Sequence, residues 1–147
     1  MEEKSLIKLR TEKLGELNIK TEDIITFDEG ILGYEDYKQY VIVNFEECRP
    51  FEWLICVEDP MIAFPIINPL PLFTDYNPLD SVEEVQSLHI EDRGDVETFC
   101  IVTLGEDPAQ VTINLKGPIL VNMGNNKGKQ VVLTEDYYNL HHPLVKT

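Results

Sequence analysis

Apolar and polar residues alternate most regularly between residues 111 and 133. Every second residue from Val111 to Leu115 is apolar, which is the two-residue period of a strand with one buried face. Pro118 interrupts this pattern and is expected at the first residue of a second strand, where its missing N–H is tolerated. Residues 124–126, Gly-Asn-Asn, predict a tight hairpin before a third strand over residues 130–133. These three strands predict a meander, which needs a further sheet to be stable.

Other short runs rich in β-branched and aromatic residues predict the rest of that sheet. The first two runs are expected to pair around a turn at Gly15, and the run over residues 61–67 is apolar enough to be buried on both faces. The expected strands are residues 6–11, 16–20, 24–27, 40–45, 51–57, 61–67 and 96–104.

Helical patterns are rare in this chain. Residues 80–88 predict a short helix, because Ser81 and Glu84 have the spacing of a capping box. Residues 35–39 are expected to form one helical turn. The chain is therefore expected to fold as a single all-β domain over residues 1–147, mainly antiparallel, with one or two short helices.

Residues 68–78 contain three prolines, which exclude a regular helix and a central strand. The segment is nevertheless too apolar for an ordinary solvated loop. It is expected either to lie across the core or to rim a groove for a partner.

The net charge of −15 is concentrated in the middle of the chain. Residues 21–110 hold 21 acidic and three basic side chains, whereas both ends are slightly basic. An acidic surface that keeps the protein soluble is one interpretation, and the other is that the acidic middle repels nucleic acid or recognises a basic partner. Direct binding of nucleic acid is not expected, because phosphate contacts need clustered Lys and Arg.

Several kinds of chemistry are not expected. No apolar run approaches the roughly 20 residues of a membrane span, and no secretory signal is visible. Cys48, Cys56 and Cys100 lack CxxC spacing and are expected to be free thiols in a reducing compartment. The glycines of residues 124–130 do not have phosphate-loop spacing. The adjacent His141 and His142 lack metal-ligand spacing. We therefore expect no enzyme activity, no metal and no cofactor.

Five islands of sequence together resemble the bacterial flagellar assembly factor family FliW, over residues 14–144. The islands are residues 25–34 (Ile-Thr-Phe-Asp-Glu-Gly-Ile-Leu-Gly-Tyr), Ala63-Phe64 with Asn68-Pro69, Asn114-Leu115 with Pro118-Ile119 and Asn122, residues 128–131 (Gly-Lys-Gln-Val), and His142-Pro143-Leu144. Tyr34, Cys56 and Gly117 depart mildly from the family pattern. Residues 1–13 are interpreted as an N-terminal extension.

The resemblance implies a compact β-barrel-like fold and a cytoplasmic protein without enzymatic activity. Members of this family bind flagellin before export. When free, they bind and antagonise CsrA, a dimeric RNA-binding repressor of flagellin translation. The resemblance therefore implies two protein partners, flagellin and CsrA, and a monomer that binds neither nucleic acid nor membrane. The acidic middle of the chain adds a hypothesis, in which the bound protein repels RNA from CsrA over about a Debye length, near 8 Å.

The partner-binding residues are expected around the proline-broken segment and the acidic pair before the preceding strand. They are Glu58, Asp59, Phe64, Leu72, Phe73, Asp75 and Tyr76. Several of these side chains are equally consistent with a place in the core. The alternative function is a β-barrel that binds a small molecule in its apolar interior.

Overall fold

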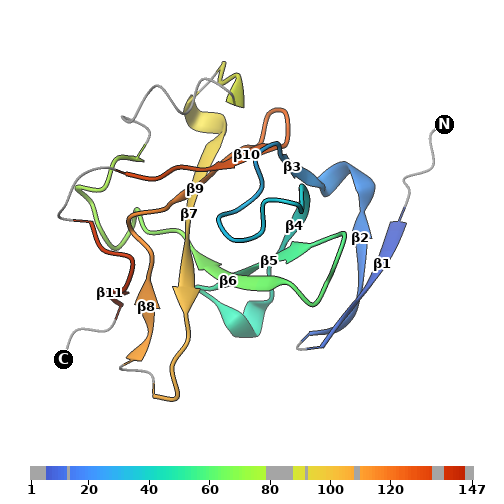
Figure 1. Ribbon diagram of the computed structural model, residues 1–147, viewed down its shortest axis with the longest axis horizontal. Helices are drawn as coiled ribbons and strands as arrows, with labels where there is room; N and C mark the ends of the chain where they lie inside the picture. Colours follow the sequence, from blue (N-terminus) through green and yellow to red (C-terminus); the bar gives the residue numbers. More distant parts are fainter. Residues whose placement is uncertain are drawn as a thin grey trace.

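The computed structural model describes residues 6–12, 14–78, 88–91, 93–107, 110–133 and 138–144. Its centre is a closed barrel of seven strands, in which β9 pairs with both β7 and β10 and so joins the two ends of the sheet (Figure 1). All pairs are antiparallel except β10 with β3. The barrel strands are β3 (Ile25–Phe27), β4 (Gln39–Val43), β5 (Glu52–Cys56), β6 (Ala63–Ile67), β7 (Val96–Thr103), β9 (Ile119–Asn122) and β10 (Lys127–Gln130).

Two small additions lie on opposite sides of the barrel (Figure 1). The hairpin of β1 (Leu6–Thr11) and β2 (Gly15–Lys20) forms a sheet of its own, and Gly15 takes a φ of 76° at its turn. On the other side, β8 (Thr112–Ile113) extends the sheet beyond β7, and β11 (His142–Pro143) pairs with β8. The 3-10 helices that lie entirely within the described residues are η1 (Thr21–Asp23), η2 (Glu46–Cys48) and η5 (Arg93–Asp95).

Side chains fill the inside of the barrel. Strands β3 to β7 and β9 each contribute inward residues to one buried cluster, in which the rings of Phe27 and Tyr40 meet edge to face at 5.2 Å. Two other clusters cover the outside: the β1–β2 hairpin packs its apolar face on Val41, Trp53 and Ile55, and the proline-broken segment packs near Cys100 on β7. The interior is thus a packed core.

The expected all-β, barrel-like fold is confirmed, and most predicted strands lie within a few residues of their observed bounds. The predicted meander is wrong for its first strand. Strand β8 pairs with β7 and β11 and not with β9, whereas β9 pairs with β10 as expected. The third strand begins three residues earlier than expected, at Lys127, and Asn126 alone of residues 124–126 has a positive φ. The hairpin expected there is confirmed.

Two further expectations are corrected. Residues 35–39 do not form the expected helical turn. A turn at residues 35–36 is followed by two residues without regular structure, and β4 then begins at Gln39. Strand β6 is fully buried only at Ile66 and Ile67, which pair with β7, whereas its first three residues pair with β5 alone and are partly exposed. The predicted helix over residues 80–88 lies outside the described residues apart from Leu88. None of the helices within the described ranges has the length and apolar character needed to span a bilayer.

Candidate functional site

The loop between β3 and β4 is shaped by two glycines. Gly30 has a φ of 69°, and a Cβ there would lie 2.7 Å from the Cα of Glu35. Gly33 has a φ of 88° with open space around it. Because L-residues with a side chain rarely adopt this region, the loop conformation depends on both glycines. We call residues 28–38 the signature loop.

A single amide side chain fastens the signature loop to the barrel. Gln130 at the end of β10 accepts a hydrogen bond from the backbone N–H of Leu32 (2.9 Å) and donates one to the carbonyl of Gly117 (3.0 Å). Behind it, Gly128 gives room to Phe27, whose ring atom Cζ would lie 2.5 Å from a Cβ at that position. Residues of two sequence islands, 25–34 and 128–131, therefore meet in space.

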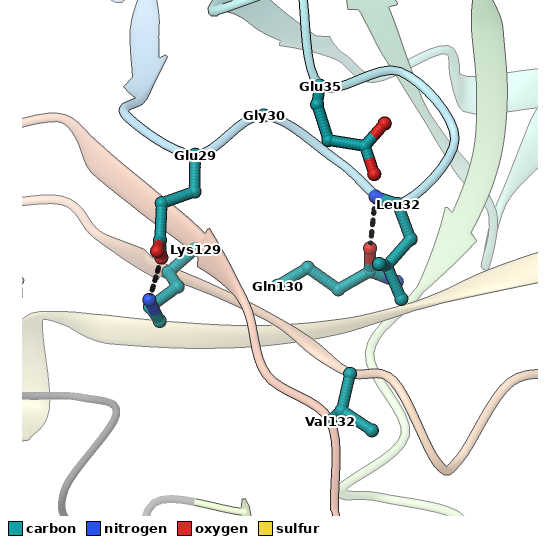
Figure 2. A pocket seen from close by; sticks show the side chains of 7 residues that line it. All are labelled: Glu29, Gly30, Leu32, Glu35, Lys129, Gln130 and Val132. Carbon is teal, nitrogen blue, oxygen red and sulfur yellow. Dashed lines mark hydrogen bonds and ion pairs between the residues drawn. The ribbon is translucent and has the colours of Figure 1, made fainter.

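The space between the signature loop and β10 is a surface pocket of about 410 Å³, shown in Figure 2. We call it the loop pocket. Lys129 forms an ion pair with Glu29 across it, and its side chain is only 16% exposed. Leu32 and Val132 are 61% and 43% exposed. The lining residues are Glu29, Gly30, Leu32, Glu35, Lys129, Gln130 and Val132.

The carboxylate of Glu35 supports the same loop. It accepts a hydrogen bond from the backbone N–H of Gly33 (3.1 Å), and this bond, followed by the N–H of Glu35 itself and the charge of Lys38, lowers the pKa of Glu35 below 4.5. Lys38 in turn donates to the carbonyl of Glu35 at 2.5 Å. The Glu35 carboxyl at the pocket rim is thus ionised at neutral pH.

A second depression of about 340 Å³ lies along the proline-broken segment. We call it the proline groove, and its lining residues are Leu72, Phe73, Thr74, Asp75, Tyr76 and Tyr138. Tyr76 forms its floor: it is 2% exposed, donates from its hydroxyl to the carbonyl of Leu115 (2.5 Å), and meets the ring of Tyr138 edge to face at 5.1 Å. Leu72 is 53% exposed at the rim. The segment therefore does both things that the sequence left open, lying on the core and rimming a groove.

Burial also controls the acid–base properties of the groove floor. The Cys100 Sγ lies 3.8 Å from the Tyr76 hydroxyl, and burial raises the pKa of Cys100 to about 12. Burial likewise raises the pKa of Tyr76, with a further contribution from Cys100. Both groups are neutral at physiological pH and have a structural role.

The seven predicted partner-binding residues fall in two places. Leu72, Phe73, Asp75 and Tyr76 line the proline groove. The other three adjoin the signature loop: Glu58 accepts from the backbone N–H groups of Lys38 (2.6 Å) and Gln39 (2.9 Å), Asp59 accepts from Met61, and Phe64 meets the ring of Tyr34 at 5.1 Å.

None of the seven residues predicted from the sequence lines the loop pocket, so all of its lining residues, Leu32, Gln130 and Val132 among them, were missed. No local signal connects Leu32 with Gln130, which lies 98 residues further along the chain. His142 packs its ring against Phe73 at 5.0 Å. Within the part of the chain that the structure describes, no three His, Cys, Asp or Glu side chains lie close enough together to hold a metal ion.

These features define a class of protein: a closed β-barrel with a packed interior, whose depressions open on its outer surface. The family model for the FliW protein matches residues 8–144, and the chain belongs to this family. A flagellar assembly factor FliW from Caldicellulosiruptor bescii is 44% identical over 97% of this chain and 91% of its own length. One from Ruminiclostridium cellulolyticum is 41% identical over 93% of both chains.

A solved structure from the same family has the same fold. A crystal structure of the flagellar assembly factor FliW superimposes with a TM-score of 0.88 at 32% identity, and the match covers 96% of this chain and 99% of that one. The resemblance found in five sequence islands is therefore confirmed along almost the whole chain.

Proposed function

We propose that this chain is a cytoplasmic flagellar assembly factor that acts by occupying two protein partners. It binds flagellin and, when flagellin has been exported, binds the translational regulator CsrA. Capture of CsrA relieves repression of flagellin mRNA, so the level of free protein reports on flagellin export. The protein acts as a monomer and transforms no substrate.

The observation that carries this proposal is the position of the depressions relative to the core. The inward residues of the barrel, among them Phe27, Leu54 and Ile119, are fully buried against one another. The loop pocket and the proline groove both open outward and present exposed leucines. Exposed apolar side chains with a polar rim are typical of protein interfaces. A packed interior argues against the alternative, a barrel that holds a small molecule inside.

The charge of the chain supports a mechanism for the effect on CsrA. Residues 21–110 have 18 more acidic than basic side chains, whereas a surface that binds RNA must be basic. When this acidic protein docks beside the RNA-binding surface of CsrA, its carboxylates lie near the path of the RNA. Repulsion between the carboxylates and the RNA phosphates acts over about 8 Å at physiological salt. Antagonism is therefore expected to weaken as salt rises, even where CsrA itself stays bound.

The test is a titration of the purified protein into CsrA bound to flagellin leader RNA, with and without added flagellin. We expect release of RNA, and we expect flagellin to suppress that release. Binding to neither protein would overturn the proposal. Release of RNA that is unchanged after acidic residues near the docked RNA are neutralised, with CsrA affinity preserved, would overturn the electrostatic mechanism alone.

A further inference from the structure

The loop pocket displays an exposed leucine on a backbone that is held in place. Leu32 is 61% exposed, yet its N–H is bound to the side chain of Gln130, and the turn before it needs a left-handed Gly30. Val132, also exposed, lines the same pocket from the segment after β10 (Figure 2). An apolar side chain on ordered backbone favours binding, because little conformational entropy is lost when a partner covers it.

The surroundings of this leucine are acidic. The signature loop carries four carboxylates and one amine, and Glu58 ties a further acidic pair to it through the N–H groups of residues 38 and 39. Two lysines of β10 offset part of this charge, since Lys127 lies 3.5 Å from Asp28 and Lys129 pairs with Glu29. The balance of six carboxylates against three amines remains negative.

This charge selects among the proteins that could cover the pocket. A second copy of the chain would bring the same carboxylates face to face, which like-charge repulsion disfavours. A partner with lysine or arginine around an apolar side chain is complementary to the pocket in both charge and polarity.

We propose that the loop pocket is a docking site for a positively charged protein surface. The partner places an apolar side chain between Leu32 and Val132 and a lysine or arginine beside Glu29 or Glu35. This inference rests on the proposed function, in which the partner of this chemistry is the RNA-binding repressor CsrA rather than flagellin. Lys129 then acts as an internal counterion that the cation of the partner displaces from Glu29.

The first test removes the apolar contact. Leu32→Ser is compared with Leu104→Ser, a matched change at a leucine that is 53% exposed and does not line the pocket. Affinities for purified CsrA and for purified flagellin are measured by titration calorimetry. We expect Leu32→Ser to weaken CsrA binding about tenfold through lost apolar burial and to leave flagellin binding unchanged. Leu104→Ser should leave both affinities at their wild-type values.

The second test has the opposite sign. Lys129→Gln removes the internal counterion and leaves Glu29 open to the cation of the partner. We expect CsrA binding to tighten about threefold at 0.05 M salt and the gain to disappear at 1 M salt. If Lys129 only stabilised the fold, the same change would weaken binding at every salt concentration. Circular dichroism of each variant verifies that the barrel is intact.

The outcomes separate this inference from the function beneath it. A wild-type protein that binds neither partner overturns the proposed function and the docking site with it. A wild-type protein that binds CsrA, with Leu32→Ser and Lys129→Gln both at wild-type affinity, overturns the docking site alone. Loss of flagellin binding in Leu32→Ser, with CsrA binding retained, shows that the pocket serves the other partner and overturns the assignment.

Discussion

The loop pocket and the proline groove are both outward depressions, but they are held together by different forces. Polar contacts shape the loop pocket: a glutamine amide, a glutamate carboxylate and an ion pair position a backbone that carries an exposed leucine. Apolar burial shapes the proline groove, where Tyr76 reaches into the core beside Cys100. Substitutions in the groove are therefore expected to affect folding first, and substitutions in the pocket to affect binding first.

The largest expected effect is at the groove floor. Tyr76→Ala removes a ring that is 2% exposed and the donor to the carbonyl of Leu115, so we expect a loss of about 3–5 kcal/mol in the free energy of unfolding. Tyr76→Phe keeps the ring and should lose about 1–2 kcal/mol. Urea denaturation measures both values. The matched rim change, Leu72→Ala, should cost less than about 1 kcal/mol. An equal loss at Leu72 and Tyr76 would contradict the division between floor and rim.

A smaller effect is expected at the glycines of the signature loop. Gly30→Ala puts a Cβ against the backbone of Glu35 in addition to a positive φ, whereas Gly33→Ala meets only the unfavourable φ. We expect the free energy of unfolding to fall by about 1 kcal/mol in Gly33→Ala and by at least about 2 kcal/mol in Gly30→Ala. Thermal unfolding compares the two variants. Equal costs would show that the loop relaxes away from Glu35.

The contact between Gln130 and the loop should have a modest effect on stability and a clear effect on local order. Gln130→Ala loses two hydrogen bonds, for about 1–2 kcal/mol in the free energy of unfolding. Amide hydrogen exchange at Leu32 should rise more than exchange within β5, because the loop opens locally. Uniform acceleration across the barrel would mean that Gln130 supports the whole sheet.

The smallest effects concern pH, and they differ in direction between the two regions. The lowered pKa of Glu35 contributes stability that is present above about pH 4.5 and is lost as pH falls through its folded value. The raised pKa of Cys100 contributes stability that is present below pH 9.0 and is lost as pH rises toward 12. Glu35→Gln should therefore lower the thermal midpoint at neutral pH and remove its dependence on pH in acid, where the variant and wild type converge, and Cys100→Ala should remove the dependence on pH in alkali. The reverse pattern would contradict these assignments.

The sequence was informative wherever structure is local. Alternation and runs of β-branched and aromatic residues located the barrel strands. Pairing was less accessible: β8 and β9 both lie against β7, and nothing in their alternation says which end of that long strand each one takes. The proline-broken segment remained ambiguous because its buried Tyr76 and exposed Leu72 follow no regular period.

The site was harder to predict than the fold for the same reason. Four of the seven expected residues line one groove, since they are neighbours in the chain. The loop pocket joins residues about 100 positions apart, and the contact from Gln130 to Leu32 depends on how the barrel closes. The resemblance to the family partly made up for this missing signal. Its islands include both Leu32 and Gln130, although the resemblance does not indicate that the two residues touch.

The parallel pairing of β10 with β3 also has a consequence for synthesis. Lys127 pairs with Thr26 and Gly128 with Phe27. Strand β3 therefore cannot pair with β10 until a segment about 100 residues further along the chain has been synthesised. The nascent chain cannot complete the loop pocket, so a newly made molecule presents this surface only after its translation is nearly finished.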